Sequence, residues 1–390
     1  MSDPSAVTLR ANGYALAGWE SVSIRRSVDE ACSSFALAVS QRYAIGNPIP
    51  LRNGDAVEVY IGDDKVITGW VDVVEPSIAA TSHSISVSGR SKTCDFVDCS
   101  AVDLPLRWRK RRVEQIAQDL AKAFGLRVRT VGSTGTALAR FAVEHGETCY
   151  AALDRAINDR FLLVTDDAEG DLVIASFGSF PRSTTQIVEG QNMLSGKSRA
   201  DSSKIYSDIR VKGQRVGNDQ DYGVMVSDVT GQALDTEARR YRPLAINMSG
   251  PASPKLAKSR AVWEAKTRMA KSLLTSVEVQ GWRQGDGRLW AVGELVSVRS
   301  DSLGIDGDLL IAAIDYKLDA QGTRAALELA IPEAYTPEIA EPKQGGGGTR
   351  AGVSYLYREL RYGVGRPTSA AGDAWRKANQ TFGLLTGEEP

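Results

Sequence analysis

The chain has 390 residues, of which 42% are hydrophobic and 24% charged, and its formal net charge is −1. This length predicts roughly two to three domains with ordinary cores, and the near-zero charge argues against a chain drawn as a whole to nucleic acid or an anionic membrane. No apolar run approaches the roughly 20 residues that span a bilayer, and the sequence opens without the basic and apolar regions of an export signal.

The residues that most often carry chemistry are few and scattered. His83 and His145 are the two histidines, and neither lies in a nucleophile–base signature, so both are predicted to be surface residues. The cysteines lack the paired spacing of a zinc site and are predicted to be reduced, small apolar residues. They are Cys32, Cys94, Cys99 and Cys149. The sequence therefore predicts no catalytic site, cofactor, metal or small-molecule substrate.

The first part of the chain, residues 1–104, is predicted to be a small β-barrel domain. Strands are expected at Val7–Arg10, Tyr14–Ile24 and Phe35–Val39. Three further short runs of alternating or β-branched residues, separated by turn signals, fill Gly54–Gly89. Short, closely spaced strands of this kind favour a barrel or sandwich.

Residues 105–186 change in character and are predicted to form an α/β insert domain. Apolar residues recur at helical spacing in Arg112–Gly125 and in Thr148–Phe161. Between two later strands lies an acidic turn, 166–171, which lacks the distal glutamate of a calcium loop. We expect this turn to be a solvated hairpin tip.

A basic run at the start of the insert is the sharpest charge feature of the sequence. It consists of Arg107, Trp108, Arg109, Lys110, Arg111 and Arg112. Such a composition can grip phosphate. Alternatively, the run enters a helix and pairs with acids on a neighbouring domain or chain, and the balanced net charge favours this second interpretation.

Residues 187–335 are predicted to form a second β-barrel domain with a long helix. Strands are expected at Ile205–Lys212, Tyr222–Asp228 and Pro243–Met248, and a helix at Ser253–Leu274. The segment Gly293–Ile331 then returns to short strand-like runs.

This late segment repeats the pattern of Gly54–Gly89. The hexapeptides that begin at Gly54 and Gly293 align, Val71-Asp72 matches Ile314-Asp315, and Ile85–Val87 matches the strand around Leu327–Leu329. The offset drifts from 239 to 243, which a longer hairpin loop in the second copy would explain. An internal repeat of this kind predicts two copies of one β-domain with other sequence between them.

The end of the chain is predicted to be extended. Residues 336–350 are rich in proline and glycine, as a linker is. Residues 351–390 carry aromatic residues, among them Tyr355, Tyr357 and Trp375, without a core-forming period. Such a segment either docks on a partner or is a disordered tail, and the sequence leaves both open.

Many short segments, in the same order, resemble the baseplate hub proteins of contractile phage tails, of the Mu-like gpP type. They include Gly18–Ile24, Thr68–Asp72, Gly89–Thr93 and Val113–Ala117. The likeness runs from about Val7 to Ile331.

The resemblance implies two tail-tube-like barrels in each chain and a homotrimer, so that six barrels form a pseudo-sixfold ring. Such a hub joins the hexameric tail tube to the trimeric central spike, contacts other baseplate proteins, nucleates baseplate assembly and leaves a lumen for transient passage of DNA. It is a structural protein of the virion tail baseplate, made in the cytoplasm of the host bacterium.

Two alternatives stay open from the sequence: a peptidoglycan hydrolase of the tail tip, and a nucleic-acid clamp through Arg107–Arg112. Under the hub interpretation, a set of basic and aromatic residues is expected to contact partners. These are Arg107, Trp108, Arg109, Arg111, Arg112, Tyr355, Tyr357 and Trp375.

Overall fold

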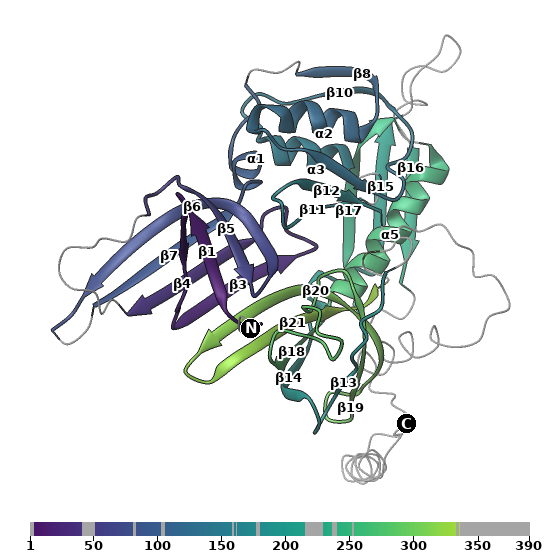
Figure 1. Cartoon of the computed structure of the whole chain (residues 1–390). Coiled ribbons are helices and arrows are strands. Elements are labelled where there is room, and N and C mark those ends of the chain that lie inside the picture. Colours follow the sequence, from purple (N-terminus) through teal and green to yellow (C-terminus); the bar gives the residue numbers. More distant parts are fainter. Residues whose placement is uncertain are drawn as a thin grey trace, which may run out of the picture.

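The computed structural model describes residues 4–40, 51–80, 83–102, 106–157, 160, 162–176, 180–214, 229–235, 240–251, 253–332 and 335. The predicted linker and tail, with Tyr355, Tyr357 and Trp375, therefore lie outside the described residues. Within them the protein is mainly β with an α/β insert, as the sequence predicted (Figure 1).

The first β unit is an antiparallel sheet with strand order β3-β4-β7-β6-β5-β1-β2. Alternation in the sequence decides which face is buried: Val57, Val59 and Ile61 of β5 point inward and the residues between them do not. The strands are β1 (Val7–Ala11), β2 (Tyr14–Leu16), β3 (Ser21–Ser27), β4 (Ser34–Ser40), β5 (Ala56–Ile61), β6 (Asp64–Ile78) and β7 (His83–Ser91).

The second β unit repeats this arrangement, except that β2 has no counterpart among its described strands. Its order is β14-β18-β21-β20-β19-β13, which corresponds to β3-β4-β7-β6-β5-β1. The one difference in direction is that β13 runs parallel to β19, whereas β1 is antiparallel to β5. The strands are β13 (Ile187–Val188), β14 (Met193–Ala200), β18 (Leu273–Gln280), β19 (Leu295–Ser300), β20 (Ile305–Asp319) and β21 (Gly322–Ala330).

Equivalent backbone hydrogen bonds occur within each of the two units. The N–H of Gly54 donates to the carbonyl of Val71 over 2.8 Å, and the N–H of Gly293 donates to the carbonyl of Ile311 over 2.9 Å. Both glycines have positive φ, +88° and +82°, a conformation that favours glycine. A register shift follows in each unit, directly after Val71 and directly after Ile311.

This bulge corrects the predicted alignment of the repeat. Val71 corresponds to Ile311 rather than to Ile314, so the offset drifts by one residue and not by four. The Val-Asp and Ile-Asp pairs that suggested the longer drift are a coincidence of sequence, because Ile314 lies three residues beyond the equivalent position.

The α/β insert has its own core between two helices and a small sheet. Strands β11, β12 and β9 form the sheet, β8 pairs with β10, and α2 and α3 pack together over buried residues such as Ile116 and Leu153. The elements are α1 (Cys94–Asp98), β8 (Arg107–Arg111), α2 (Val113–Ala121), η1 (Lys122–Phe124), β9 (Val128–Val131), β10 (Leu138–Ala142), α3 (Cys149–Ile157), β11 (Leu163–Asp166) and β12 (Leu172–Ala175).

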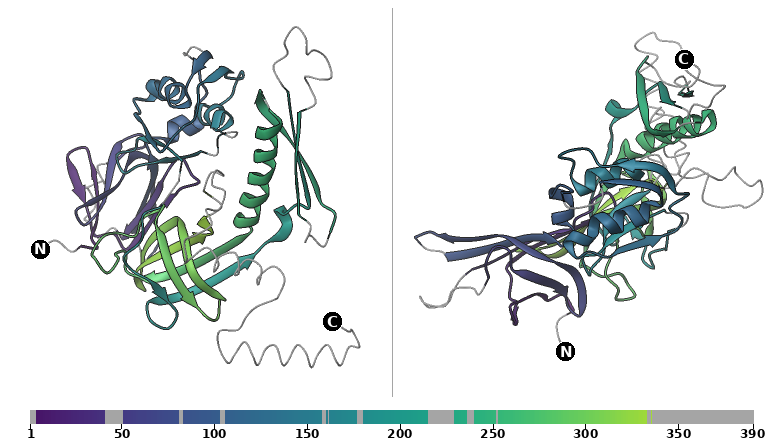
Figure 2. Two further views of the ribbon diagram at one scale, coloured as in Figure 1. Left: turned by 90° about the vertical axis from the view of Figure 1, so that its right-hand side faces the viewer. Right: turned by 90° about the horizontal axis from the view of Figure 1, so that it is seen from above.

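The strands expected at Ile205–Lys212 and Pro243–Met248 do not join the second β unit. With β16, which the sequence did not predict, they form a separate sheet, β16-β15-β17, with its own small core against α5 (Figure 2). Gly231 permits this contact, since a Cβ there would lie 2.1 Å from the Ala257 backbone. The predicted strand Tyr222–Asp228 lies outside the described residues. The elements are η3 (Ser202–Lys204), β15 (Asp208–Gln214), β16 (Val229–Leu234), β17 (Pro243–Pro251) and α5 (Pro254–Lys271).

Candidate functional site: the strand edges of two matched units

The two β units are joined by a strand pairing that we call the internal seam. Strand β3 of the first unit pairs antiparallel with the second half of β20, from Ser27 opposite Ala313 to Val22 opposite Leu318. The N–H of Val28 extends the pairing with a 2.9 Å bond to the Ala312 carbonyl. One continuous sheet therefore runs through both units.

Charged and polar side chains cross the internal seam. Arg25 donates from Nη1 to Glu328 over 2.9 Å, and this bond is the main reason that the pKa of Arg25 is raised. Ser23 donates from Oγ to Asp315 over 2.9 Å. Beneath them Ile24 and Tyr316, directly opposite each other, are buried, so the seam combines an apolar underside with a polar surface.

Each unit also has a strand edge that corresponds to one side of the internal seam but pairs with no further strand among the described residues. Strand β14, the counterpart of β3, pairs with β18 and with no other described strand along its second edge. Strand β6, the counterpart of β20, pairs beyond Asp72 with β7 alone among the described strands. We call these two surfaces the β14 edge and the β6 arm; the arm protrudes at the left in Figure 1.

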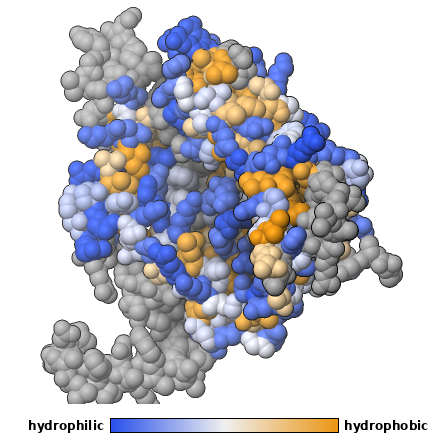
Figure 3. Space-filling view, turned by 90° about the vertical axis from the view of Figure 1, so that its left-hand side faces the viewer, coloured by the Kyte–Doolittle hydropathy of each residue, from blue (hydrophilic) through white to orange (hydrophobic). Residues whose placement is uncertain are grey.

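The β6 arm exposes apolar side chains that its counterpart buries. Val73 is 46% exposed, whereas the equivalent Ala313 is 2% exposed, and Ile78 is 76% exposed. On the side of the molecule where the arm protrudes, apolar patches lie between polar ones (Figure 3). An unpaired strand with exposed apolar residues is a surface prepared for another strand.

The basic run forms a β-strand, so the prediction that it enters a helix is wrong except at its last residue, Arg112, which precedes α2. Strand β8 pairs with β10, and Arg109 lies directly opposite Arg140. Trp108 faces the other way and is buried against Phe141, with ring centroids 6.0 Å apart, and its Nε1 donates to Asp119. Trp108 is therefore a core residue of the insert and not part of an exposed surface.

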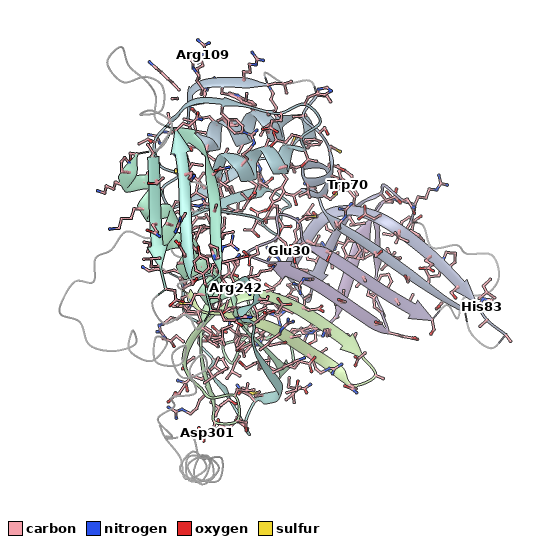
Figure 4. All side chains as sticks on the ribbon, turned by 180° about the vertical axis from the view of Figure 1, so that it is seen from behind. Glu30, Trp70, His83, Arg109, Arg242 and Asp301 are labelled. Carbon is pink, nitrogen blue, oxygen red and sulfur yellow. The ribbon has the colours of Figure 1, made fainter. Side chains whose placement is uncertain are left out.

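The outward face of this hairpin, which we call the arginine ribbon, consists of Arg107, Arg109, Arg111 and Arg140. None of the four has an ion-pair partner within the part of the chain that the structure describes, whereas Arg112 lies 3.6 Å from Glu114. Like charges placed directly opposite on paired strands are unfavourable. The ribbon therefore suits an acidic partner. It is a separate surface from the β6 arm, because Arg109 lies far from His83, the residue of β7 opposite Ile78 at the end of the arm (Figure 4).

The acidic turn is not a solvated hairpin tip, and that prediction is wrong. Asp166 and Asp171 are 4% and 5% exposed. Asp166 accepts hydrogen bonds from the backbone N–H of Ser33 over 2.9 Å and from the Ser33 hydroxyl over 2.7 Å. Asp171 pairs with Arg127. The turn thus fastens the insert to the first β unit, 133 residues away in sequence.

The remaining candidates for chemistry stay apart. His83 and His145 are both exposed, as predicted. Among the described residues no three histidine, cysteine or acidic side chains gather as a metal site would require. No described helix combines the length and apolar character needed to cross a bilayer.

Solved structures place this fold among phage tail proteins. A 43 kDa tail protein of prophage MuSo2 from Shewanella oneidensis is 31% identical, with a TM-score of 0.75 over 85% of this chain and 100% of the other. A tail protein from Neisseria meningitidis MC58 is 23% identical, with a TM-score of 0.74 over 85% and 98% of the two chains. The duplicated, edge-exposing β unit is thus the architecture of a phage tail protein.

Sequence comparison identifies the family. The family models "Mu phage baseplate assembly protein GpP-like, N-terminal", "Baseplate hub protein gp44-like, second domain" and "Mu phage baseplate assembly protein GpP, fourth domain" match residues 6–91, 93–176 and 253–338. Baseplate hub protein gp44 of Escherichia phage Mu is 33% identical over 368 residues, which cover 91% of this chain and 96% of that protein. The chain therefore belongs to the family of Mu-like phage baseplate hub proteins.

Proposed function

We propose that this protein is the hub of a contractile-tail baseplate and that it acts as a homotrimer. Three chains supply six matched β units, which form a pseudo-sixfold ring around a lumen for DNA. The ring joins a hexameric tail tube on one side to a trimeric central spike on the other, and it nucleates baseplate assembly.

The observation that carries this proposal is the internal seam between two units of the same strand order. The seam joins different surfaces of the two units, β3 of one and β20 of the other. Contacts of this head-to-tail type generate closed rings when the rotation between units permits closure. One chain already contains one such step, and its two free edges are the counterparts of the surfaces that made it.

The trimer is tested by the mass and symmetry of the purified protein. Native mass spectrometry is expected to give a species of three 42.0 kDa chains, and electron micrographs are expected to show a ring with six similar lobes. Pull-downs with the tube and spike proteins of the same particle then test the two attachments. A stable monomer or dimer at high concentration would refute the ring.

The proposed role is structural and not catalytic. The relatives named above are called tail or baseplate hub proteins, and the described residues bring together no nucleophile–base pair around either histidine. A peptidoglycan-degradation assay tests this, and turnover above that of a heat-inactivated sample would contradict it.

The arginine ribbon supports a second, more local proposal: it binds an acidic surface of a neighbouring baseplate protein or subunit. A DNA clamp is the competing interpretation. Replacing Arg109 and Arg111 by glutamine is expected to weaken assembly with baseplate partners and to leave DNA mobility shifts unchanged. A salt-sensitive DNA shift that the double variant abolishes would favour the clamp instead.

A further inference from the structure

We propose that the β14 edge of one copy pairs antiparallel with the β6 arm of a second copy, in the register that the internal seam sets within one chain. This inference rests on the proposed trimer and specifies its contact residue by residue. Each β14 edge is thus occupied by the β6 arm of a neighbouring copy, and each β6 arm by the β14 edge of the other neighbour.

The register follows from the equivalence of the two units. For the arm, Ile311 corresponds to Val71, so Asp315 corresponds to Glu75 and Leu318 to Ile78. Within the internal seam Asp315 lies opposite Arg25. Glu75 therefore takes the place of Asp315 in the contact between copies.

The other side of the register comes from the neighbouring strands. Phe35 and Thr275 are equivalent, because they lie opposite the equivalent residues Gly89 and Leu329.

Ile24 lies opposite Phe35, and Ser198 lies opposite Thr275, so Ile24 corresponds to Ser198. One residue further along the strands, Arg25 corresponds to Arg199, and one residue back, Ser23 corresponds to Lys197.

The charges of the open edges complement each other in this register. Arg199 comes to lie opposite Glu75 of the next copy, with the same signs as Arg25 opposite Asp315. Lys197 takes the place of Ser23, which donates to Asp315 in the internal seam. Glu75 would therefore meet two cations, and opposite charges across paired strands are favourable.

The exposed apolar residue near the tip of the arm finds cover in the same arrangement. The pairing would shield Ile78, which is 76% exposed in the single chain, whereas Val73 would lie opposite Asp201, one residue beyond β14. Gly196 lies opposite Ile78, and the Leu303 side chain, which occupies the space where a Cβ of Gly196 would lie, is an apolar neighbour for Ile78. Pro76 has no N–H to donate, so the ladder lacks one backbone hydrogen bond. The side-chain pairs therefore contribute more to its specificity.

Charge reversal tests the pairing of Glu75 with Arg199. Glu75→Arg and Arg199→Glu are each expected to weaken trimer formation roughly fivefold or more, and the double variant is expected to recover most of the loss. Arg299→Glu, at an exposed arginine of β19 outside the seam, is the matched control. Circular dichroism confirms that each chain folds, and sedimentation at several concentrations measures assembly.

Disulfide trapping tests the register itself. In a Cys99→Ser background, Ser77→Cys combined with Lys197→Cys places two thiols directly opposite each other, and oxidation is expected to give covalently closed trimers. The combination of Ser77→Cys with Ser195→Cys, two positions out of register, is expected to give few.

The outcomes separate the two proposals. Efficient cross-linking through Ser195 in place of Lys197, or a trimer that Glu75→Arg leaves unchanged, overturns the register while the ring stands. A chain that folds but forms no trimer in any variant, the wild type included, overturns both.

Discussion

One buried carboxylate, that of Asp166, helps to fasten the insert to the first β unit, beside the bonds from Thr165 to the Ser27 carbonyl and from Thr68 to the Ala168 carbonyl. Replacing Asp166 by alanine removes the acceptor for the backbone N–H and the hydroxyl of Ser33, which is itself 2% exposed. Hydrogen bonds to a charged group contribute about 1.5–3 kcal/mol each, and a donor left unsatisfied in a buried site adds its desolvation cost. Because the two bonds share one carboxylate, we expect a loss of about 3 kcal/mol for the docked state rather than the full sum.

Hydrogen exchange at the Ser33 amide is the direct assay, since this N–H donates to Asp166. A loss of that size corresponds to about 100-fold faster exchange through local opening. Asp166→Asn keeps one acceptor oxygen and is expected to fall between the wild type and Asp166→Ala. Glu169→Ala, at an exposed position of the same turn, is the control and should change stability by less than about 0.5 kcal/mol. Unchanged Ser33 protection in Asp166→Ala would show that the carboxylate does not hold the two parts together.

Three further predictions concern charge and pH. Arg140→Glu places an acid opposite Arg109 and is expected to raise the thermal midpoint by the equivalent of about 0.5 kcal/mol, whereas a lower midpoint would mean that the arginines do not repel each other. Hydrogen bonds from the Ser300 hydroxyl and its neighbours lower the pKa of Glu189 to about 2 from 4.5, so the stability that it contributes is present above pH 4.5 and is lost as the pH falls towards 2; Glu189→Gln should remove that part of the acid dependence in pH-jump unfolding. Burial raises the pKa of Tyr316 to about 12 from 10.0, so its contribution is complete below pH 10 and is lost as the pH rises towards 12. Burial also raises the pKa of Tyr335 and of Tyr150, so tyrosinate absorbance is compared with that of Tyr316→Phe, which should lose one late-titrating residue.

The duplication was predictable because it rests on local chemistry. Gly54 and Gly293 precede similar alternating runs. A positive φ favours glycine, so these two positions can be recognised in the sequence. The exact register of the repeat was not predictable. The bulge after Val71 and after Ile311 depends on pairing with the neighbouring strand, and no characteristic residue type marks it in the sequence.

The surroundings of the basic run and of the acidic turn were predictable only in part. The alternation Arg107, Trp108, Arg109 was in the sequence and has the period of a strand, so the burial of Trp108 could have been anticipated. The burial of Asp166 could not, since it depends on Ser33 on a distant segment. The open edges of β14 and β6 could not be predicted from the sequence either, because an edge strand is identified only when the pairing of all other strands is known.

The sheet of β15, β16 and β17 with α5 interrupts only one of the two matched units, between β14 and β18. The corresponding place in the first unit is the short connection from β3 to β4. In the ring we propose, this added lobe recurs at every second position, 120° apart by threefold symmetry. The strands of the ring would then match a sixfold-symmetric neighbour, while the three added lobes would match a threefold-symmetric one. Two repeated units in one polypeptide would thus connect sixfold to threefold symmetry.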